Sequence, residues 1–144
     1  MTVRMNRSCM LKIFVDFDGT ITRRDVGDAL FETFGGEICK EAIELYRMGD
    51  ISAVECFRRE CAACSRVLPS ALNAFIDAQE IDPTFPSFIK YCRSQGCAIS
   101  VLSDGMDYYI GRILNRCGAG DVPYFSNILH LRPVDGTPFK ILPM

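Results

Sequence analysis

The 144-residue chain lacks several features that would assign it to common classes of protein. Neither sign of charge is in excess, because 16 basic residues face 18 acidic ones and the net charge is −2; this argues against nucleic-acid or membrane-surface binding. No apolar run approaches the roughly 20 residues that span a bilayer, and Met1 to Leu11 has no apolar segment of the kind that a secretory signal needs. Repeats and low-complexity segments are also missing. We therefore expect a cytoplasmic globular protein that binds a small molecule, with no nucleic acid or membrane as partner.

Histidine is scarce, whereas cysteine is abundant. The one histidine, His130, falls in an expected strand or loop, and we interpret it as structural. The eight cysteines lie mostly inside apolar patterns, which favours reduced thiols buried as small hydrophobic groups. Cys56, Cys61 and Cys64 also have the C-x₄-C-x₂-C spacing of one kind of iron–sulfur site. The helical pattern around them favours burial in a core over that alternative.

The most informative segment is Leu11 to Thr20, an apolar run that leads into two acids, a glycine and a threonine. Side chains two positions apart on an extended chain point to the same side, so we expect Asp16 and Asp18 to crowd together at a strand end. Like charges at close range raise each other's pKa unless a cation holds them. The segment therefore predicts a Mg²⁺ site, a shared proton, or both.

The order of the elements indicates an α/β fold. Residues 12–17 and 97–102 are short apolar runs typical of buried strands. We expect a short third strand at 124–125 and interpret 127–131 as another, before a proline-containing loop. Helical patterns separate the first two strands, and strand–helix–strand order predicts a parallel sheet with right-handed crossovers.

Helical spacing of apolar residues marks the segments between these strands. Ser52 and Glu55 form a predicted capping box, and Asp82 followed by Pro83 predicts another helix start. Residues 25–81 are interpreted as an inserted helical cap, and residues 1–24 with 82–144 as the α/β core. The expected helices are 25–34, 37–48, 52–66, a segment from about 69, 82–95 and 106–117.

A second polar motif, Ser103-Asp104-Gly105, follows the second strand. Ligands of open α/β sheets bind at the carboxyl ends of the strands, so this motif and Asp16-x-Asp18 are expected to meet there. Main-chain N–H groups and a hydroxyl at a helix start can hold phosphate oxygens, for which Ser103, Asp104, Gly105 and Thr20 are the candidates. Asp16 could attack phosphorus and Asp18 could carry the proton, with Mg²⁺ as counter-charge. A plain turn at Asp16-x-Asp18 and a plain helix cap at Ser103 are the alternatives.

These motifs resemble those of the haloacid dehalogenase-like (HAD) phosphatases. Residues 16–21 resemble the family's first motif, D-x-D-G-T, and residues 101–105 resemble its second, a strand that ends in serine or threonine. The resemblance implies a Rossmann-like parallel sheet in which Asp16 is the nucleophile, Asp18 the acid and base, and Ser103 a phosphate ligand. It also implies that Asp16 and the main-chain carbonyl of Asp18 bind Mg²⁺.

Further residues resemble the phosphoserine phosphatase-like branch of that family. The helical insertion resembles its cap, and Asp25 lies nine residues after Asp16, where this branch has an acidic residue facing the substrate. A simple N-cap role for Asp25 is an equal alternative. Residues 106–109 and 126–127 are closest in pattern to the methylthiopentenyl-phosphate phosphatases. The implied reaction is hydrolysis of a small phosphorylated metabolite.

Two parts of the family pattern have no clear counterpart. The family has a lysine that offsets charge at the nucleophile, and then an acidic pair after a further strand. Lys140 is the only lysine after Lys90, and Asp135 is the only acid after Asp121; neither has the expected sequence around it. We therefore expect the chain to stop before these motifs. The alternative function is an incomplete or non-catalytic relative.

An incomplete sheet has a structural consequence. The first strand, with Ile13, Phe14 and Val15, would then form an exposed edge. Because an apolar edge can pair with another chain, we expect self-association through this strand.

Overall fold

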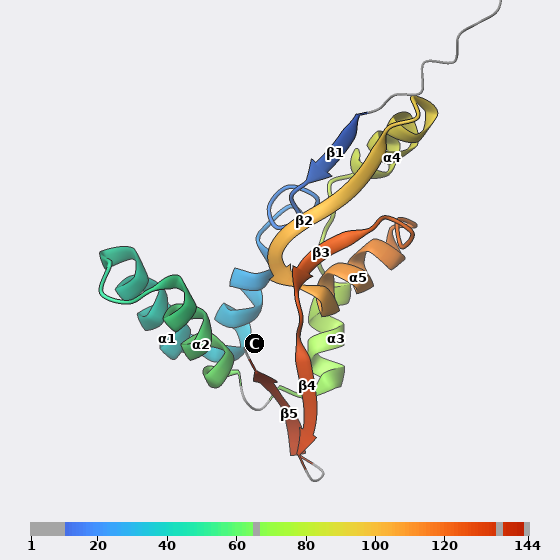
Figure 1. The fold of residues 1–144 in the computed structure, drawn as a ribbon. Helices are drawn as coiled ribbons and strands as arrows, with labels where there is room; N and C mark the ends of the chain where they lie inside the picture. Colours follow the sequence, from blue (N-terminus) through green and yellow to red (C-terminus); the bar gives the residue numbers. More distant parts are fainter. Residues whose placement is uncertain (1–10, 65–66, 135–136, 143–144) are drawn as a thin grey trace, which may run out of the picture.

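The computed structural model describes residues 11–64, 67–134 and 137–142, and beyond residue 129 it describes the main chain alone. Three strands form a parallel sheet in the order β1-β2-β3: β1 (Lys12–Val15), β2 (Ala98–Met106) and β3 (Tyr124–Asn127) (Figure 1). Since apolar residues of β1 lie in register with those of β2, for example Ile13 with Ile99, the strands share one buried layer. The α/β sheet predicted from the sequence is confirmed.

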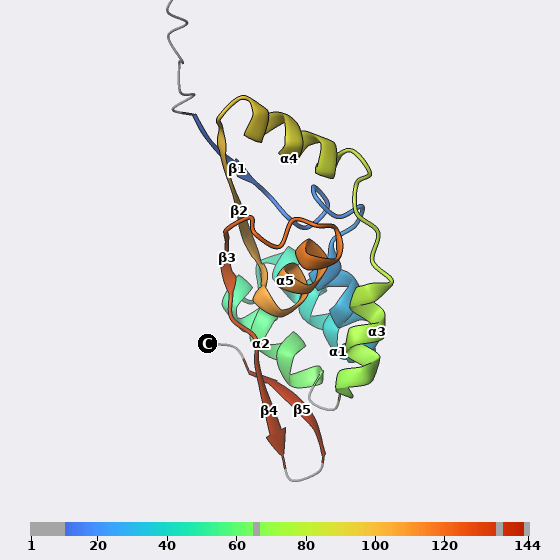
Figure 2. The same cartoon turned by 90° about the vertical axis from the view of Figure 1, so that its right-hand side faces the viewer.

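Helices connect the strands and cover the sheet. Figure 2 shows α4 and α5 on the same side of it, as expected for two crossovers of one hand between adjacent parallel strands. The helices of the described chain are α1 (Val26–Met48), α2 (Ala53–Ala63), α3 (Pro69–Asp77), α4 (Phe85–Ser94) and α5 (Asp107–Arg116).

The longest helix, α1, is interrupted at Gly36, which has φ 58° and ψ −138°. The two helices expected at 25–34 and 37–48 therefore follow each other without a loop, with a corner between them that suits a residue without a Cβ. Gly49 ends the second half in the left-handed conformation. At the next helix, the hydroxyl oxygen of Ser52 accepts from the N–H of Glu55 at 3.2 Å, so the Ser52 half of the predicted capping box is confirmed. The carboxylate of Glu55 instead accepts from Arg58 and Arg59.

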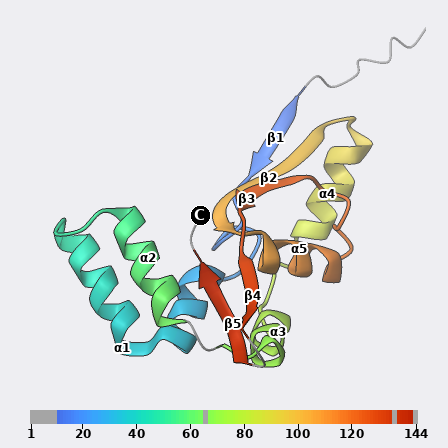
Figure 3. The ribbon, with the colours of Figure 1, turned by 60° about the horizontal axis from the view of Figure 1, so that its bottom comes forward.

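The first two helices stand apart from the third. Figure 3 shows α1 and α2 packed side by side to one side of the sheet. By contrast, α3 is held by α5, because the hydroxyl of Tyr108 donates to Asn73 Oδ1 at 2.8 Å and Arg112 pairs with Asp77 at 2.6 Å. The division of the chain into a core and a cap of residues 25–81 stays a prediction.

Three local predictions are wrong. Asp82 does not cap a helix: its Oδ1 accepts from the N–H of Thr84 at 2.8 Å in a turn, and α4 starts later, at Phe85. Strand β2 does not end at Leu102 but continues to Met106, with an irregular register against β3.

The third concerns the C-terminal loop, which is instead an antiparallel hairpin of β4 (His130–Val134) and β5 (Thr137–Leu142). Each strand contains a proline, which a two-stranded ribbon tolerates because both of its strands are edges. Lys140 lies in β5, opposite Arg132.

Thiols fill part of the core between α1 and α2. Cys39, Cys61 and Cys64 are fully buried, and burial raises the pKa of Cys39 to about 11 and those of Cys61 and Cys64 to about 12. Because such thiols stay protonated near neutral pH, they act as small hydrophobic groups, as predicted. No helix among the described residues combines the length and the apolar character needed to cross a membrane.

Strand β1 forms one edge of the described sheet, since β2 is its partner there. Phe14 on this edge is 55% exposed and Leu11 is 58% exposed, and the ammonium of Lys12 lies 4.9 Å from the Phe14 ring centroid. We expect association of two chains along this edge, which the variant Phe14→Lys should weaken because charge disfavours edge pairing.

Light scattering over a concentration series would measure this effect. The matched control is Met48→Lys, at an exposed position at the end of α1, which should associate like the unchanged protein. A protein that stays monomeric at high concentration would contradict the expectation.

Candidate functional site

A tightly hydrogen-bonded turn follows β1. The buried residue Phe17 anchors it, because its carbonyl accepts from the N–H of Ile21 at 2.9 Å and of Thr22 at 3.1 Å. The buried hydroxyl of Thr22 also accepts from the N–H of Gly19, at 3.2 Å, where φ is 70°. Residues 16–22 are therefore held in one conformation, and the two acids within it are oriented by the main chain.

Asp16 is exposed at the end of β1. Its Oδ1 accepts from the N–H of Phe17 at 2.8 Å, and its Oδ2 accepts from the hydroxyl of Thr20 at 3.2 Å. Thr20, predicted to bind phosphate, thus lies against Asp16 and orients its carboxylate. An oriented carboxylate that remains open to solvent can reach an incoming phosphorus atom.

Asp18, unlike Asp16, is held by groups outside the turn. Its Oδ1 accepts from the N–H of Val26 at 2.8 Å, and its Oδ2 accepts from the hydroxyl of Tyr109 at 2.7 Å. Burial raises the pKa of Asp18, and the carboxylate of Asp25 raises it further, although both hydrogen bonds act against this. One part of the prediction for Asp16 and Asp18 is therefore wrong. The neighbouring carboxylate that raises the pKa of Asp18 is that of Asp25, and among the described residues Asp16 and Asp18 share no hydrogen-bond partner.

The Ser103-Asp104-Gly105 segment lies beside Asp18, as the sequence predicts. The hydroxyl of Ser103 is 3.4 Å from Asp18 Oδ2 and accepts from the N–H of Gly105 at 2.9 Å. However, these residues belong to the irregular end of β2, and α5 begins only at Asp107. The segment therefore leads directly into the helix expected from Met106, which has Met106 as its N-cap, but its own residues are a strand end and lie outside the first turn.

Tyr109 is a site residue that the sequence interpretation missed. It is 1% exposed, its ring centroid lies 5.9 Å from that of Phe17, and burial raises the pKa of its hydroxyl. It therefore remains a proton donor to Asp18 at any physiological pH. Its position four residues before Ile113, on the inward face of the helix, was the available signal.

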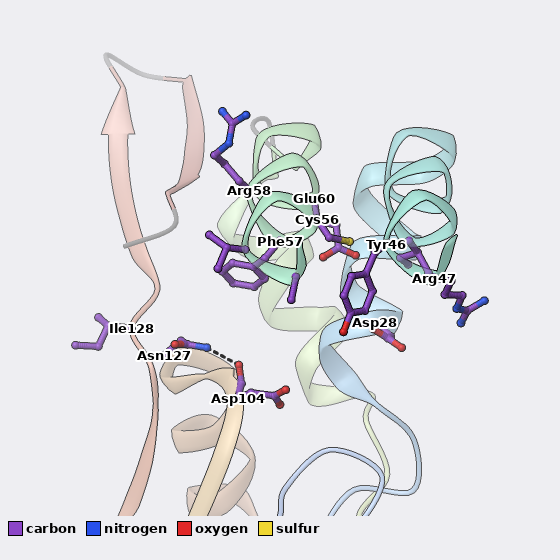
Figure 4. A pocket seen from close by; sticks show the side chains of 13 residues that line it. Asp28, Tyr46, Arg47, Cys56, Phe57, Arg58, Glu60, Asp104, Asn127 and Ile128 are labelled. Carbon is purple, nitrogen blue, oxygen red and sulfur yellow. Dashed lines mark hydrogen bonds between the residues drawn. The ribbon is translucent and has the colours of Figure 1, made fainter. Parts of the chain in front are cut away.

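Two neighbouring pockets share lining residues, and Asp18 lines the smaller of them. The smaller, of about 120 Å³, is lined by Asp18, Gly105 and Tyr109 and by residues of α1 and α2. The larger, of about 590 Å³, lies between α1, α2 and the ends of β2 and β3 (Figure 4). The residues that line both are Asp28, Phe57, Glu60 and Asp104.

Asp25 combines the two roles considered for it. Its Oδ1 accepts from the N–H of Asp28 at 2.8 Å, which makes it the N-cap of α1. It also lines the small pocket beside Asp18. The N-cap is confirmed, and contact with a substrate stays a prediction.

Oxygen atoms at the end of β1 fit a hard cation such as Mg²⁺. They are the carboxylate of Asp16 and the main-chain carbonyl of Asp18. No described residue donates a hydrogen bond to the Asp18 carbonyl. No cluster of three or more His, Cys, Asp or Glu side chains suited to a metal occurs in the described ranges, and Asp16 and Asp18 are the candidate ligands within them. Mg²⁺ characteristically keeps waters and phosphate oxygens beside one or two carboxylates, and the residues fit that mode.

The structure gives no support to an iron–sulfur site at the three cysteines Cys56, Cys61 and Cys64. Cys56 and Cys61 lie within α2 and Cys64 ends it, all buried against α1. Together they form no such metal-binding cluster with other described side chains.

The two carboxyl groups therefore differ in environment. Asp16 is exposed and fixed by hydrogen bonds, whereas Asp18 is half-buried and has a raised pKa. An exposed, oriented carboxylate beside a carboxyl group with a raised pKa suits a nucleophile paired with a proton carrier.

Comparison with known proteins adds to this geometry. A sequence profile of the haloacid dehalogenase-like hydrolases matches residues 13–131. The Pdp3-interacting factor 1 of Schizosaccharomyces pombe is 30% identical over 135 residues, which are 90% of this chain and 59% of that protein. The 2-hydroxy-3-keto-5-methylthiopentenyl-1-phosphate phosphatase of Brevibacillus brevis is 30% identical over 122 residues, 81% of this chain and 53% of that enzyme.

A solved structure has the same fold. A HAD family hydrolase from Salmonella enterica serovar Typhi superposes with a TM-score of 0.75 at 20% identity, over 91% of this chain and 43% of that one. The chain thus spans about half the length of the proteins it matches.

Proposed function

Because the chain belongs to the haloacid dehalogenase-like hydrolases, we propose that it hydrolyses a phosphomonoester of a small metabolite through an aspartyl-phosphate intermediate. The observation that carries this proposal is the pairing at the end of β1. There the exposed Asp16 is oriented by Phe17 and Thr20, and the half-buried Asp18 is held by Tyr109 with a raised pKa.

In the first half of the reaction, a carboxylate oxygen of Asp16 attacks phosphorus, and the bond from phosphorus to the leaving oxygen breaks. Protonated Asp18 gives its proton to that oxygen, so the product leaves as a neutral alcohol. The raised pKa of Asp18 supports this role, because a larger fraction of the carboxyl groups then holds a proton at a given pH.

In the second half, the carboxylate of Asp18 takes a proton from water as the water oxygen attacks the phosphorylated Asp16. The bond from phosphorus to Asp16 breaks, inorganic phosphate leaves, and Asp18 is protonated again. The hydroxyl of Ser103, which lies 3.4 Å from Asp18 Oδ2, would donate to a phosphate oxygen from the end of β2.

Mg²⁺ is part of the proposal as the cofactor. The carboxylate of Asp16 and the carbonyl of Asp18 would hold it, and it would supply positive charge between the phosphate and the attacking carboxylate. With two protein ligands among the described residues, we expect weak Mg²⁺ binding and turnover below that of longer relatives. The second candidate function is binding of a phosphomonoester with slow turnover. It is favoured because, among the described residues, no basic side chain contacts Asp16 to offset its charge.

A reducing compartment agrees with the buried thiols of the core. A cytoplasmic location is therefore included in the proposal.

The test is release of phosphate by the whole chain in the presence of Mg²⁺. We expect release that exceeds one equivalent per chain and stops when EDTA removes the metal. A colorimetric phosphate assay on a panel of small phosphomonoesters measures it, and addition of excess Mg²⁺ should restore it. Failure to release even one equivalent over many hours, or release that EDTA does not change, would contradict the proposal.

A further inference from the structure

The outer edge of β1 presents main-chain groups as well as side chains. The N–H of Ala98 donates to the carbonyl of Leu11 at 3.2 Å, so the main chain of every second residue from Leu11 on points toward β2. The N–H and C=O groups of Lys12 and Phe14 therefore point away from β2. Figure 1 shows β1 at the outer margin of the described sheet. Such a row of outward-pointing main-chain groups can accept another strand.

The side chains of this strand alternate with the same period. Lys12, Phe14 and Asp16 are exposed, whereas Ile13 and Val15 pack against the core. Since side chains two positions apart lie on one face, the exposed face has a positive charge at one end, an aromatic ring in the middle and a negative charge at the other. This order of charges becomes complementary to itself when a second copy of the strand runs in the opposite direction.

Neither charge on this face has an ionic partner within the described chain. The carboxylate of Asp16 accepts from the N–H of Phe17 and the hydroxyl of Thr20, and no described lysine or arginine pairs with it. The ammonium of Lys12 lies 4.9 Å from the Phe14 ring centroid, and four residues of extended chain separate it from Asp16 by roughly 13 Å. A phosphate next to Asp16 would therefore add negative charge to a carboxylate that no described side chain offsets.

The direction of the main-chain groups limits how two such strands can pair. In an antiparallel pair, outward-pointing residues of one strand lie opposite outward-pointing residues of the other, so Lys12 can face Lys12, Phe14 or Asp16 of a second copy. The first register opposes like charges, which destabilises a strand pair, and the second leaves no charged residue opposite Asp16. The third pairs opposite charges and places the two Phe14 rings side by side, an aromatic pair that stabilises a sheet. Charge complementarity therefore selects the third register.

We propose that two copies of the chain pair antiparallel through β1, and that Lys12 of each copy completes the site of the other by offsetting the charge at Asp16. Directly opposite residues of such a pair have Cα atoms about 5.5 Å apart, which brings the ammonium within reach of the Asp16 carboxylate and of a phosphate beside it. The two three-stranded sheets then form one continuous sheet with a self-complementary interface. The role of Lys12 rests on the proposed phosphatase function, whereas the pairing itself does not.

Disulfide cross-linking tests the pairing without any need for turnover. Lys12→Cys in one chain and Asp16→Cys in another would lie opposite each other, within the Cα separation of roughly 4.4–6.8 Å that a disulfide spans. We expect a mixture oxidised with oxidised glutathione to give a dimer joined between positions 12 and 16, identified by mass spectrometry. Either chain alone should form no dimer through its new cysteine, because the two copies of that position would be at least roughly 13 Å apart. Ile38→Cys, at an exposed position on α1, replaces Lys12→Cys in the matched control and should give no cross-link to position 16.

Mixing two impaired chains tests the contribution of Lys12 to the site of the other copy. Lys12→Ala should lower kcat/KM for phosphate release by at least about tenfold, because a fixed positive charge at the phosphate is lost, and Lys12→Arg should lower it less. A dimer of Lys12→Ala with Asp16→Asn has one site with both groups. An equal mixture should therefore recover about a quarter of the activity of the unchanged protein, since random pairing gives one complete site in about half of the dimers. Lys90→Ala, exposed on α4, is the matched control and should keep full activity.

Two results would overturn the inference. One is an oxidised mixture without a cross-link between positions 12 and 16, and the other is an equal mixture of Lys12→Ala and Asp16→Asn no more active than the average of its two components. Failure of the proposed function gives a different result. A cross-link between positions 12 and 16 in a protein that releases no phosphate supports the pairing and contradicts the phosphatase, whereas phosphate release by a protein that forms no such cross-link does the reverse.

Discussion

Replacing Asp16 by asparagine should reduce phosphate release by at least about a thousandfold, because an amide cannot form the covalent intermediate. The change is nearly isosteric. The amide oxygen can still accept from the N–H of Phe17, and the hydroxyl of Thr20, now 3.2 Å from the other end of the group, can accept from the new NH₂. The fold should therefore persist, and the loss should be chemical.

Measurement of kcat and of the unfolding midpoint distinguishes a loss of the chemical step from a loss of the fold. Asp50→Asn is the matched control, since Asp50 is exposed beyond the end of α1 and should keep full activity. Mass spectrometry of acid-quenched unchanged protein should locate a phosphoryl group on Asp16. Turnover by Asp16→Asn equal to that of the unchanged protein, or a phosphoryl group on another residue, would contradict the assignment.

Gly105→Ala should damage both stability and activity, although it adds only one methyl group to the site. A Cβ at this position would lie 2.5 Å from Asp18 Oδ2 and would collide with the hydroxyl of Tyr109. Tyr109 is buried, and its hydroxyl is held by the hydrogen bond that it donates to Asp18. We expect a loss of about 2–3 kcal/mol in the free energy of unfolding and a fall in kcat of about a hundredfold, because Asp18 must move.

Urea denaturation and steady-state kinetics measure the two effects. Gly27→Ala is a graded control: its Cβ would be 3.3 Å from the same Tyr109 hydroxyl and from Asp25 Oδ1. It needs a shift of only a few tenths of an ångström, and alanine also favours a helix, so little change is expected. The double variant Gly105→Ala with Tyr109→Phe should recover part of the stability, since one of the colliding atoms is gone. Stability of Gly105→Ala equal to that of the unchanged protein would refute the close approach.

The sequence predicts the main elements because their patterns are local. Apolar runs identify β1 and most of β2, and Ser52 identifies the start of α2, since each depends on a few adjacent residues. The hairpin of β4 and β5 is missed because Pro133 and Pro138 count against strands, whereas an isolated ribbon accepts them.

The site is only partly predictable for a related reason. The pattern locates Asp16, Asp18 and Ser103 but treats β1 as extended through Asp18, whereas the hydrogen bonds to the Phe17 carbonyl turn the chain before it. The direction of Asp18 depends on Val26 and Tyr109, which are distant in sequence, so no local pattern contains it.

The corner at Gly36 separates two halves of α1 that a straight helix would hold in line. Asp28 and Tyr46 line the same pocket, although 18 residues of unbroken helix would hold them roughly 27 Å apart. The first half of α1 carries the N–H that fixes Asp18, and the second half carries Tyr46 and Arg47 on the wall of the larger pocket. Insertions or substitutions after Gly36 can therefore reshape that wall while Asp18 stays in place. Changes in what the larger pocket can bind can therefore accumulate in the second half of α1 at little cost to the position of Asp18.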